Sequence, residues 1–346
     1  MPDRAFWQDR RVWLTGHTGF KGAWLALWLQ SLGAEVHGFS AGPVSEPSLY
    51  EVAQVDDGMA GDVRGDVRSK SEVRAAVARA RPDVVIHMAA QALVRRGLTK
   101  PVETFTVNVT GTAKVLEALR AEAAPRAVVV VTSDKCYRND GRGTPFREDD
   151  PLGGEDPYSA SKAAQEHVAT AYRAFGLPLA TVRAGNVIGG GDWAPDRLVA
   201  DCMRAALAGE PVTVRAPDAV RPWQHVLCPL AGYLTVAERL LDGDPGGAWN
   251  FGPAEQDARP VGWVVDQLRA RWPGELEVSD APGDAAGGEA PMLRLDSGRA
   301  REQLGWAPGW DLAAGLDATV SWYAGYRDGA DMRAETLRQI AAYERA

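Results

Sequence analysis

The chain has 346 residues, which is enough for one large α/β domain or for a nucleotide-binding domain with a smaller partner. Its 38 Lys and Arg against 46 Asp and Glu give a formal charge of −8, which argues against general nucleic-acid binding and against a polybasic membrane contact. Without an apolar run of about 18 residues, a signal-type start, paired cysteines or paired histidines, the sequence predicts a reduced cytoplasmic protein with no metal centre.

Strands and helices alternate along the first half of the sequence. Apolar runs and helical periodicity predict, in chain order, a strand at 11–15, a helix at 23–30, a strand at 34–39, a helix at 71–80, a strand at 83–87, a helix at 102–122, a strand at 126–131, a helix at 158–175 and a strand at 179–183. Strands that are apolar throughout imply a sheet covered on both faces, and alternation with helices makes it parallel. We therefore predict an α/β fold with a Rossmann-type, doubly wound parallel sheet.

The second half is less regular. It predicts helices at 197–208, 226–241, 261–271, 312–326 and 332–343. The low-complexity run at 279–291 predicts a surface loop.

A glycine-rich turn follows the first strand. Gly16, Gly19 and Gly22 have a GxxGxxG spacing, which lets the turn approach a pyrophosphate at the amino end of the next helix, where unpaired N–H groups favour an anion. The alternative is an ordinary strand-to-helix turn. The second strand ends in Phe39-Ser40-Ala41-Gly42, without a carboxylate for the ribose or an arginine for a 2′-phosphate, so this position favours neither NAD nor NADP.

Two further patterns carry chemistry. Tyr158 and Lys162 lie one helical turn apart on one face, and an ammonium beside a phenol lowers the phenol's pKa, so that it can accept a proton from a sugar hydroxyl. The run 132–135 (TSDK) follows a valine-rich strand, at the edge of the sheet where open α/β folds bind ligands. The alternatives are an exposed i,i+4 pair and a local polar cap.

A second glycine-rich run spans 185–193, and Arg221 stands in a rigid aromatic setting before His225. An arginine can clamp a diphosphate through two N–H donors, although a structural ion pair is the alternative.

The strings TGHTGFKGAWLALWLQSLGAEV, HMAAQALVRR, VTSDKCYRN, DPYSASK and RAGNVIGGGDWAPDRL resemble the extended short-chain dehydrogenase/reductase family, and within it the enzymes that act on CDP-glucose. The resemblance extends over nearly the whole chain. It implies NAD as cofactor, CDP-glucose as substrate and a hydro-lyase reaction, in which C4 is oxidised, water is eliminated across C5 and C6, and the hydride returns to C6.

The resemblance also implies roles for individual residues. Tyr158, assisted by Lys162 and Thr132, deprotonates the C4 hydroxyl. Asp134 is the acid for the C6 hydroxyl and Lys135 the base for the C5 proton, which requires a depressed pKa or a water relay for the lysine. The residues expected at the cofactor are Gly16, His17, Thr18, Gly19, Phe20, Gly22, Asp66, Val67, Ala89, Ala90, Gln91, Asn108, Thr132, Tyr158 and Lys162. Those expected at the substrate are Ser133, Asn186, Arg197, Arg221 and His225.

Two other functions stay open: another sugar-nucleotide enzyme, such as a 4-epimerase or a dehydratase for a different nucleotide, and a non-catalytic NAD(H)-sensing protein. A 4-epimerase needs no acid/base pair beside Thr132, so the Asp134-Lys135 pair argues against it. We predict an NAD-binding Rossmann domain over 1–182 with 224–251, and a sugar-nucleotide-binding domain over 183–223 and 252–346. The family implies a homodimer or homotetramer formed through the helix that holds Tyr158.

Overall fold

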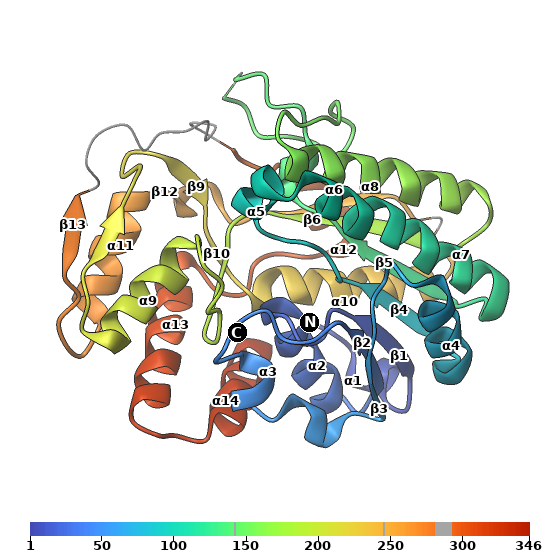
Figure 1. Ribbon diagram of the computed structural model, residues 1–346, viewed down its shortest axis with the longest axis horizontal. Helices are drawn as coiled ribbons and strands as arrows, with labels where there is room; N and C mark the ends of the chain where they lie inside the picture. Colours follow the sequence, from blue (N-terminus) through green and yellow to red (C-terminus); the bar gives the residue numbers. More distant parts are fainter. Residues whose placement is uncertain (142, 245, 281–292) are drawn as a thin grey trace.

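The computed structural model describes residues 1–141, 143–244, 246–280 and 293–346. Its centre is a seven-stranded sheet, ordered β11-β6-β5-β4-β1-β2-β3, in which every pair is parallel (Figure 1). The predicted doubly wound sheet is thereby confirmed. Its strands are β1 (Arg11–Thr15), β2 (Glu35–Ser40), β3 (Gly61–Arg64), β4 (Val84–His87), β5 (Ala127–Val131), β6 (Leu179–Ala184) and β11 (Ala248–Phe251).

Helices cover both faces of this sheet. On one face lie α2 (Phe20–Ser31) and α10 (Leu227–Leu241), and on the other lie α4 (Lys70–Ala80), α7 (Thr112–Glu122) and α8 (Pro157–Ala174). The valines of β5 alternate between them: Val129 and Val131 join the hydrophobic cluster of the α2 face, whereas Val128 and Val130 join that of the α8 face. This two-sided burial explains why the central strands are apolar throughout.

The chain reverses direction across the sheet at β1. It runs outward from β1 through β2 to β3, then returns to place β4 on the other side of β1. The connections after β1 and β4 therefore diverge, and open α/β sheets bind ligands at such a point. The glycine turn at 16–22 and the segment at 88–91 both lie there, because a Cβ on Gly16 would stand 2.8 Å from the Ala89 nitrogen.

The helix predicted at 102–122 consists of three segments. It begins as α6 (Pro101–Phe105), passes through a π-helical turn (Thr106–Gly111) and continues as α7. Before it lies α5 (Val94–Thr99), and both α5 and α6 pack against α8. The other short helices are α1 (Arg4–Trp7), α3 (Leu49–Val52) and α12 (Gly298–Leu304).

The second half of the chain lies mostly beside the sheet, on the left in Figure 1. Its last helix nevertheless packs on α2, where the Trp28 indole donates a 2.8 Å hydrogen bond to Glu344. Of the run predicted as a loop at 279–291, residues 279 and 280 belong to β13, and the rest lies outside the described residues. The helices are α9 (Leu198–Ala208), α11 (Val261–Arg271), α13 (Leu312–Arg327) and α14 (Met332–Glu344). The paired strands are β7 (Val187–Ile188) with β10 (Gln224–His225), β9 (Val220–Pro222) with β12 (Ala258–Pro260), and β8 (Val212–Val214) with β13 (Val278–Asp280).

Within the described ranges, no helix combines the length and the apolar character needed to cross a bilayer.

Candidate active site

The glycine turn between β1 and α2 tolerates no side chain at two of its three glycines. Gly16 has a φ of +77°, and a Cβ on Gly22 would lie 2.1 Å from the Gly16 carbonyl oxygen. Gly19 is the N-cap of α2, and no side chain caps the helix there. The compact turn and the free amino end of α2 fit the pyrophosphate of a dinucleotide.

The side chains of the same turn brace it against β2 and β3. His17 is buried and its Nε2 lies 2.8 Å from Asp62 Oδ1, while burial lowers the pKa of His17, so that the ring is neutral. The Thr18 hydroxyl lies 2.7 Å from that of Ser40. Phe20 points toward the second glycine-rich run, where a Cβ on Gly189 would lie 3.2 Å from its ring.

Other residues predicted at the cofactor are engaged by the protein itself. The Asp66 carboxylate pairs with Arg68, whose hydrogen bonds lower the pKa of Asp66, and Val67 lies in the core of the α8 face. Asn108 Oδ1 accepts a 2.8 Å hydrogen bond from the Gln91 backbone N–H, and its Nδ2 donates to Ser161. Asn108 thus ties the segment after β4 to α8. Ala89 and Ala90 are half-buried, and the Ala89 backbone lies beside Gly16.

Tyr158 and Lys162 stand together near the amino end of α8. Asp156 caps this helix by accepting hydrogen bonds from the backbone N–H groups of Tyr158 and Ser159, and Pro157 occupies the first helical position. The Lys162 ammonium lies 6.0 Å from the centre of the Tyr158 ring. Burial raises the pKa of Tyr158 to about 12 and lowers that of Lys162 to about 8.

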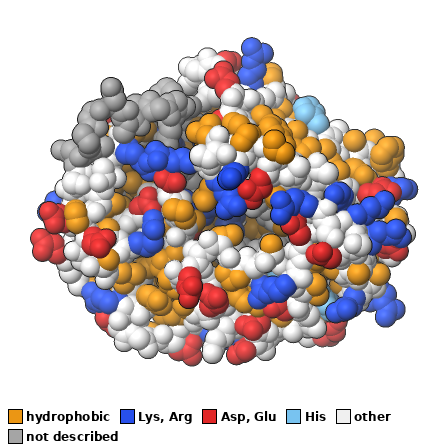
Figure 2. Space-filling view, viewed as in Figure 1, with side chains coloured by type: hydrophobic (Ala, Val, Ile, Leu, Met, Phe, Trp, Pro, Cys, Tyr) orange, Lys and Arg blue, Asp and Glu red, His pale blue; other side chains and the backbone are white. Residues whose placement is uncertain are grey.

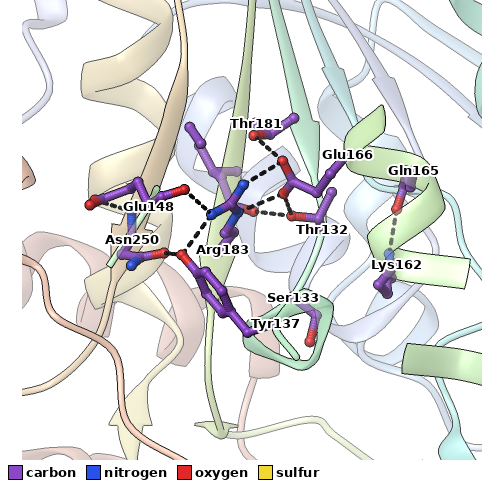
Figure 3. Close-up of polar contacts among 12 residues, drawn as sticks. Thr132, Ser133, Tyr137, Glu148, Lys162, Gln165, Glu166, Thr181, Arg183 and Asn250 are labelled. Carbon is purple, nitrogen blue, oxygen red and sulfur yellow. Dashed lines mark hydrogen bonds and ion pairs between the residues drawn. The ribbon is translucent and has the colours of Figure 1, made fainter. Parts of the chain in front are cut away.

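Thr132 and Ser133 are adjacent at the end of β5 but make different contacts (Figure 3). The Thr132 hydroxyl donates a 2.5 Å hydrogen bond to Glu166 on α8. The Ser133 hydroxyl lowers the pKa of Tyr158, although burial has the larger effect and raises it. The same Ser133 hydroxyl also donates to Asp134 Oδ1 at 2.9 Å.

Asp134 and Lys135 follow in a short 3₁₀ turn (Asp134–Cys136). Asp134 is only 4% exposed, and burial raises the pKa of its carboxyl, although Lys135, Ser133 and Arg221 oppose the rise. A carboxyl group with a raised pKa keeps its proton to higher pH than an ordinary one and can act as a proton donor. Lys135 is half-buried.

The residues predicted at the substrate fall into two groups. Arg197 forms a 2.8 Å ion pair with Asp192, and its positive charge lowers the pKa of Tyr158. The positive charge of Arg221 lowers the pKa of Asp134 in the same way. Asn186 is half-buried in the run after β6. His225 is fully buried 5.0 Å from the Trp310 ring and 5.7 Å from Trp24, and burial lowers its pKa to about 3.

A buried ion pair, which the sequence patterns do not predict, lies behind Thr132. Arg183 on β6 and Glu166 are each 3% exposed, and two guanidinium nitrogens donate to the carboxylate at 2.8 Å (Figure 3). Arg183 also donates to the Tyr137 hydroxyl at 2.6 Å. Its signals were a charged residue inside an apolar strand and a glutamate one turn beyond Lys162.

A second unpredicted contact involves Lys21, in the glycine turn at 16–22, which we also call the cofactor turn. Lys21 donates to the Tyr233 hydroxyl on α10 at 3.0 Å. Burial lowers the pKa of Lys21 to about 7, and the charges of Arg197 and Lys162 act in the same direction. Lys and Arg side chains border the hollow near the centre of the face shown in Figure 2. Among the described residues, no group of His, Cys, Asp and Glu is arranged to hold a metal ion.

Comparisons with known proteins agree with this geometry. The family model described as the NAD dependent epimerase/dehydratase family matches residues 12–252. The chain is 43% identical, over 355 aligned positions, to the CDP-glucose 4,6-dehydratase of Salmonella typhimurium, covering 99% of this chain and 98% of that protein. It is 30% identical over 336 positions to the dTDP-glucose 4,6-dehydratase of Xanthomonas campestris pv. campestris, covering 90% and 93%.

Solved structures place the same fold around NAD. The UDP-glucose 4-epimerase of Thermus thermophilus in complex with NAD has a TM-score of 0.78 and 28% identity, covering 91% of this chain and 99% of that chain. MoeE5 in complex with UDP-glucose and NAD has a TM-score of 0.79 and 26% identity, with the same coverage. The family match spans more than half of the sequence, and the glycine turn fits the cofactor of the family. The chain therefore belongs to the NAD-dependent epimerase/dehydratase family.

Proposed function

We propose that the protein is an NAD-dependent CDP-glucose 4,6-dehydratase, a hydro-lyase that converts CDP-D-glucose into CDP-4-keto-6-deoxy-D-glucose and water. The observation that carries this proposal is the buried carboxyl group of Asp134, which has a raised pKa and stands with Lys135 beside the Tyr158 site. Oxidation at C4 alone, as in a 4-epimerase, needs no such acid. The nearly full-length similarity to the Salmonella enzyme supports CDP-glucose as the substrate.

The first step is proton transfer from the C4 hydroxyl to Tyr158. Lys162 places a positive charge 6.0 Å from the centre of the phenol ring, and the Ser133 hydroxyl lowers the pKa of the phenol against the larger effect of burial. The family resemblance implies Thr132 in this supporting role, but it is the Ser133 hydroxyl that lowers the pKa of Tyr158, whereas the Thr132 hydroxyl lies against Glu166, so we assign the role to Ser133. NAD, which the glycine turn at 16–22 would hold, would supply the hydride acceptor for C4 and the hydride donor for C6.

The second step is elimination. The ketone at C4 acidifies the proton at C5, which we assign to Lys135 as base. The C5–C6 double bond forms as the C6–O bond breaks, and the proton of Asp134 converts the departing hydroxyl into water. Hydride addition at C6 and return of a proton to C5 complete the product, so the net loss is one water molecule.

For the substrate itself we assign Arg197 and Arg221, whose charges reach Tyr158 and Asp134, together with Asn186. His225 is left out of this assignment because its ring is fully buried among Trp24 and Trp310. A substrate bound near Arg197 would place its diphosphate, which can accept two hydrogen bonds from a guanidinium group, close to the reacting groups.

For the assembly we propose a homodimer formed through α5, α6 and α8. Three apolar side chains are exposed on α5 and α6: Leu98 at 60%, Val102 at 74% and Phe105 at 38%. Figure 2 shows hydrophobic side chains gathered over this part of the molecule. A second copy would remove them from water.

The test uses CDP-glucose carrying deuterium at C4, with TDP-, UDP- and GDP-glucose in parallel, and locates the label by NMR and mass spectrometry. We expect deuterium at C6 of a dehydrated CDP-sugar. A product that keeps its C6 hydroxyl but has the inverted configuration at C4 would support a 4-epimerase instead. Unchanged substrate in all four reactions would remove the enzymatic proposal and favour an NAD(H)-binding protein.

A further inference from the structure

Lys162 is held by a side chain that the mechanism above does not use. Its ammonium donates to Gln165 Oε1 at 2.9 Å, as Figure 3 shows. It also donates to the Val131 carbonyl oxygen at 3.3 Å. Gln165 lies on α8, is 1% exposed, and comes one helical turn after Lys162. The position of the ammonium therefore depends on the direction in which the Gln165 amide points.

A hydroxyl group on α7 fixes that direction. Thr112 donates its one hydroxyl hydrogen to the Asn108 carbonyl oxygen at 2.7 Å, and a carbonyl oxygen can only accept. The Thr112 oxygen must then accept from Gln165 Nε2, which lies 2.9 Å away. With its nitrogen committed to Thr112, the amide turns its oxygen toward Lys162.

The chain of hydrogen bonds continues to the cofactor turn through His87. His87 Nε2 lies 2.9 Å from the Thr112 oxygen and is therefore the protonated nitrogen, since Thr112 has no second hydrogen to give. His87 Nδ1 lies 2.7 Å from the Thr15 hydroxyl. Thr15 accepts from the backbone N–H groups of Met88 and Ala89, both at 3.1 Å, so its hydrogen points to His87.

The hydrogen-bonding roles of the Thr112, His87 and Thr15 side chains are thus assigned, and His87 is neutral, in keeping with burial that lowers its pKa to about 3. This series of hydrogen bonds ends at Thr15, directly before Gly16. It links the cofactor turn to the catalytic lysine.

We propose that Gln165 is a positioning residue for oxidation at C4: through its amide oxygen it keeps the Lys162 ammonium charged and directed toward Tyr158, in an orientation imposed by Thr112 and His87. This inference rests on the proposed function. Other groups face Lys162: Cys136 and Glu166 raise its pKa against the larger effect of burial, and its charge lowers the pKa of Lys21 on α2. Gln165 is the side chain that accepts a hydrogen bond from the ammonium, so a substitution there changes either that contact or the local charge.

The experiment follows NADH formation at 340 nm in a single turnover of the holoenzyme with CDP-glucose, as a function of pH, for two substitutions. Gln165→Leu removes the acceptor, and we expect the rate of C4 oxidation to fall roughly tenfold or more, since a hydrogen bond to a charged group is lost. Gln165→Glu keeps an acceptor but adds a charge that cancels part of the lysine's field at Tyr158. We expect it to retain most of the rate at its optimum, with the pH midpoint raised by about one unit.

Gln339 provides the matched control. It is also 1% exposed, and its Nε2 donates to the Ala318 carbonyl oxygen at 2.9 Å, but it lies on α14, away from Lys162. Gln339→Leu and Gln339→Glu should leave the pH midpoint unchanged. An unchanged rate and midpoint in both Gln165 variants, or equal shifts in the Gln339 pair, would overturn the proposal.

Thr112 gives an independent route if the Gln165 variants unfold. Thr112→Ser keeps the hydroxyl that orients the amide and should behave as the original protein, whereas Thr112→Val should reproduce the loss seen with Gln165→Leu. Identical behaviour of the two Thr112 variants counts against the proposal. If the unsubstituted protein forms no NADH with CDP-glucose, the proposed function fails; if it does and the substitutions change nothing, only the positioning role fails.

Discussion

A buried carboxyl group with a raised pKa is the residue on which the dehydration step depends. Because the pKa of Asp134 is raised, the acid form is present below that value and is lost as the pH rises through it. We expect Asp134→Asn to keep oxidation at C4 while slowing water loss by about 10² to 10⁴-fold, the usual contribution of a general acid. NADH absorbance and product NMR on the same sample separate the two steps.

The control for that substitution is Asp257→Asn. Asp257 is also buried, at 7% exposure, and burial likewise raises its pKa, but it lies beside β12 rather than at Tyr158. This variant should dehydrate CDP-glucose at the original rate. Equal rates of water loss in the Asp134 and Asp257 variants would show that Asp134 is not the acid.

The ion pair between Glu166 and Arg183 supports the strand end that carries Ser133. Burial alone would raise the pKa of Glu166, but the hydrogen bonds and charge of Arg183 lower it below its ordinary value. Such a carboxylate stabilises the fold above its unfolded-state pKa, about 4.3, and that stability is lost as the pH falls through the lower folded-state pKa. We expect Glu166→Gln to reduce the free energy of unfolding by about 3–5 kcal/mol at pH 7, because it leaves Arg183 buried without its charge partner.

Urea unfolding at pH 7 and at successively more acidic pH measures this loss, and the difference between the two proteins should shrink toward acid. Glu117→Gln is the comparison, since Glu117 pairs with Arg120 on the exposed surface of α7 and should change little. A pH-independent difference would mean that the charge of Glu166 does not contribute.

At the scale of elements, the turn into α2 is a tightly packed connection. A Cβ on Gly22 would stand 2.1 Å from the Gly16 carbonyl oxygen, so the turn must open to accept it. We expect Gly22→Ala to weaken NAD binding roughly tenfold or more, because forcing an extra methyl group into a packed site costs about 1–3 kcal/mol. Calorimetric titration with NAD gives the affinity directly.

Gly325→Ala tests whether that loss is specific. Gly325 also lies in a helix, α13, and a Cβ there would meet only the Ala330 side chain at 3.6 Å. NAD affinity should be unchanged, and the helix should gain up to about 1 kcal/mol from the better helix former. Similar losses of NAD affinity in both variants would contradict the special role of the turn.

Elements of the sheet differ in how far sequence predicts them. The strands β4, β5 and β6 are buried on both faces, so their apolar runs identify them. Edge strand β3 has the sequence Gly-Asp-Val-Arg with no buried residue, and its apolar content is too low to mark it. The π-helical turn after α6 packs against α8 and leaves no signal in the hydrophobic period of the sequence.

The site shows the same limit at the scale of the whole molecule. The spacing of Tyr158 and Lys162 predicts that they share a face, because helical geometry is local. Whether Thr132 or Ser133 faces Tyr158 depends on the placement of β5 against α8, which brings Glu166 to Thr132. His225 is buried by Trp24 and Trp310, which come from distant parts of the chain, so its sequence neighbours do not reveal its place in the core.

Assembly is the property that belongs to the whole molecule. Leu98 and Val102 project apolar surface from helices that pack on α8, and a stable dimer commonly buries about 1,200–2,000 Å² in total. We expect the protein to be a dimer by size-exclusion chromatography with light scattering, and the double substitution Leu98→Glu with Val102→Glu to produce monomers, because it would bury two unpaired charges at the interface.

Val44→Glu is the control: Val44 is 76% exposed but lies between β2 and α3, away from this surface, so that variant should remain dimeric. A dimer that survives the double substitution would place the contact elsewhere, whereas a monomeric original protein would remove the dimer from the proposal. Since α8 carries both Tyr158 and Lys162, the monomeric variant also tests whether a second copy steadies the catalytic helix: in that case its C4 oxidation slows while its affinity for NAD is retained.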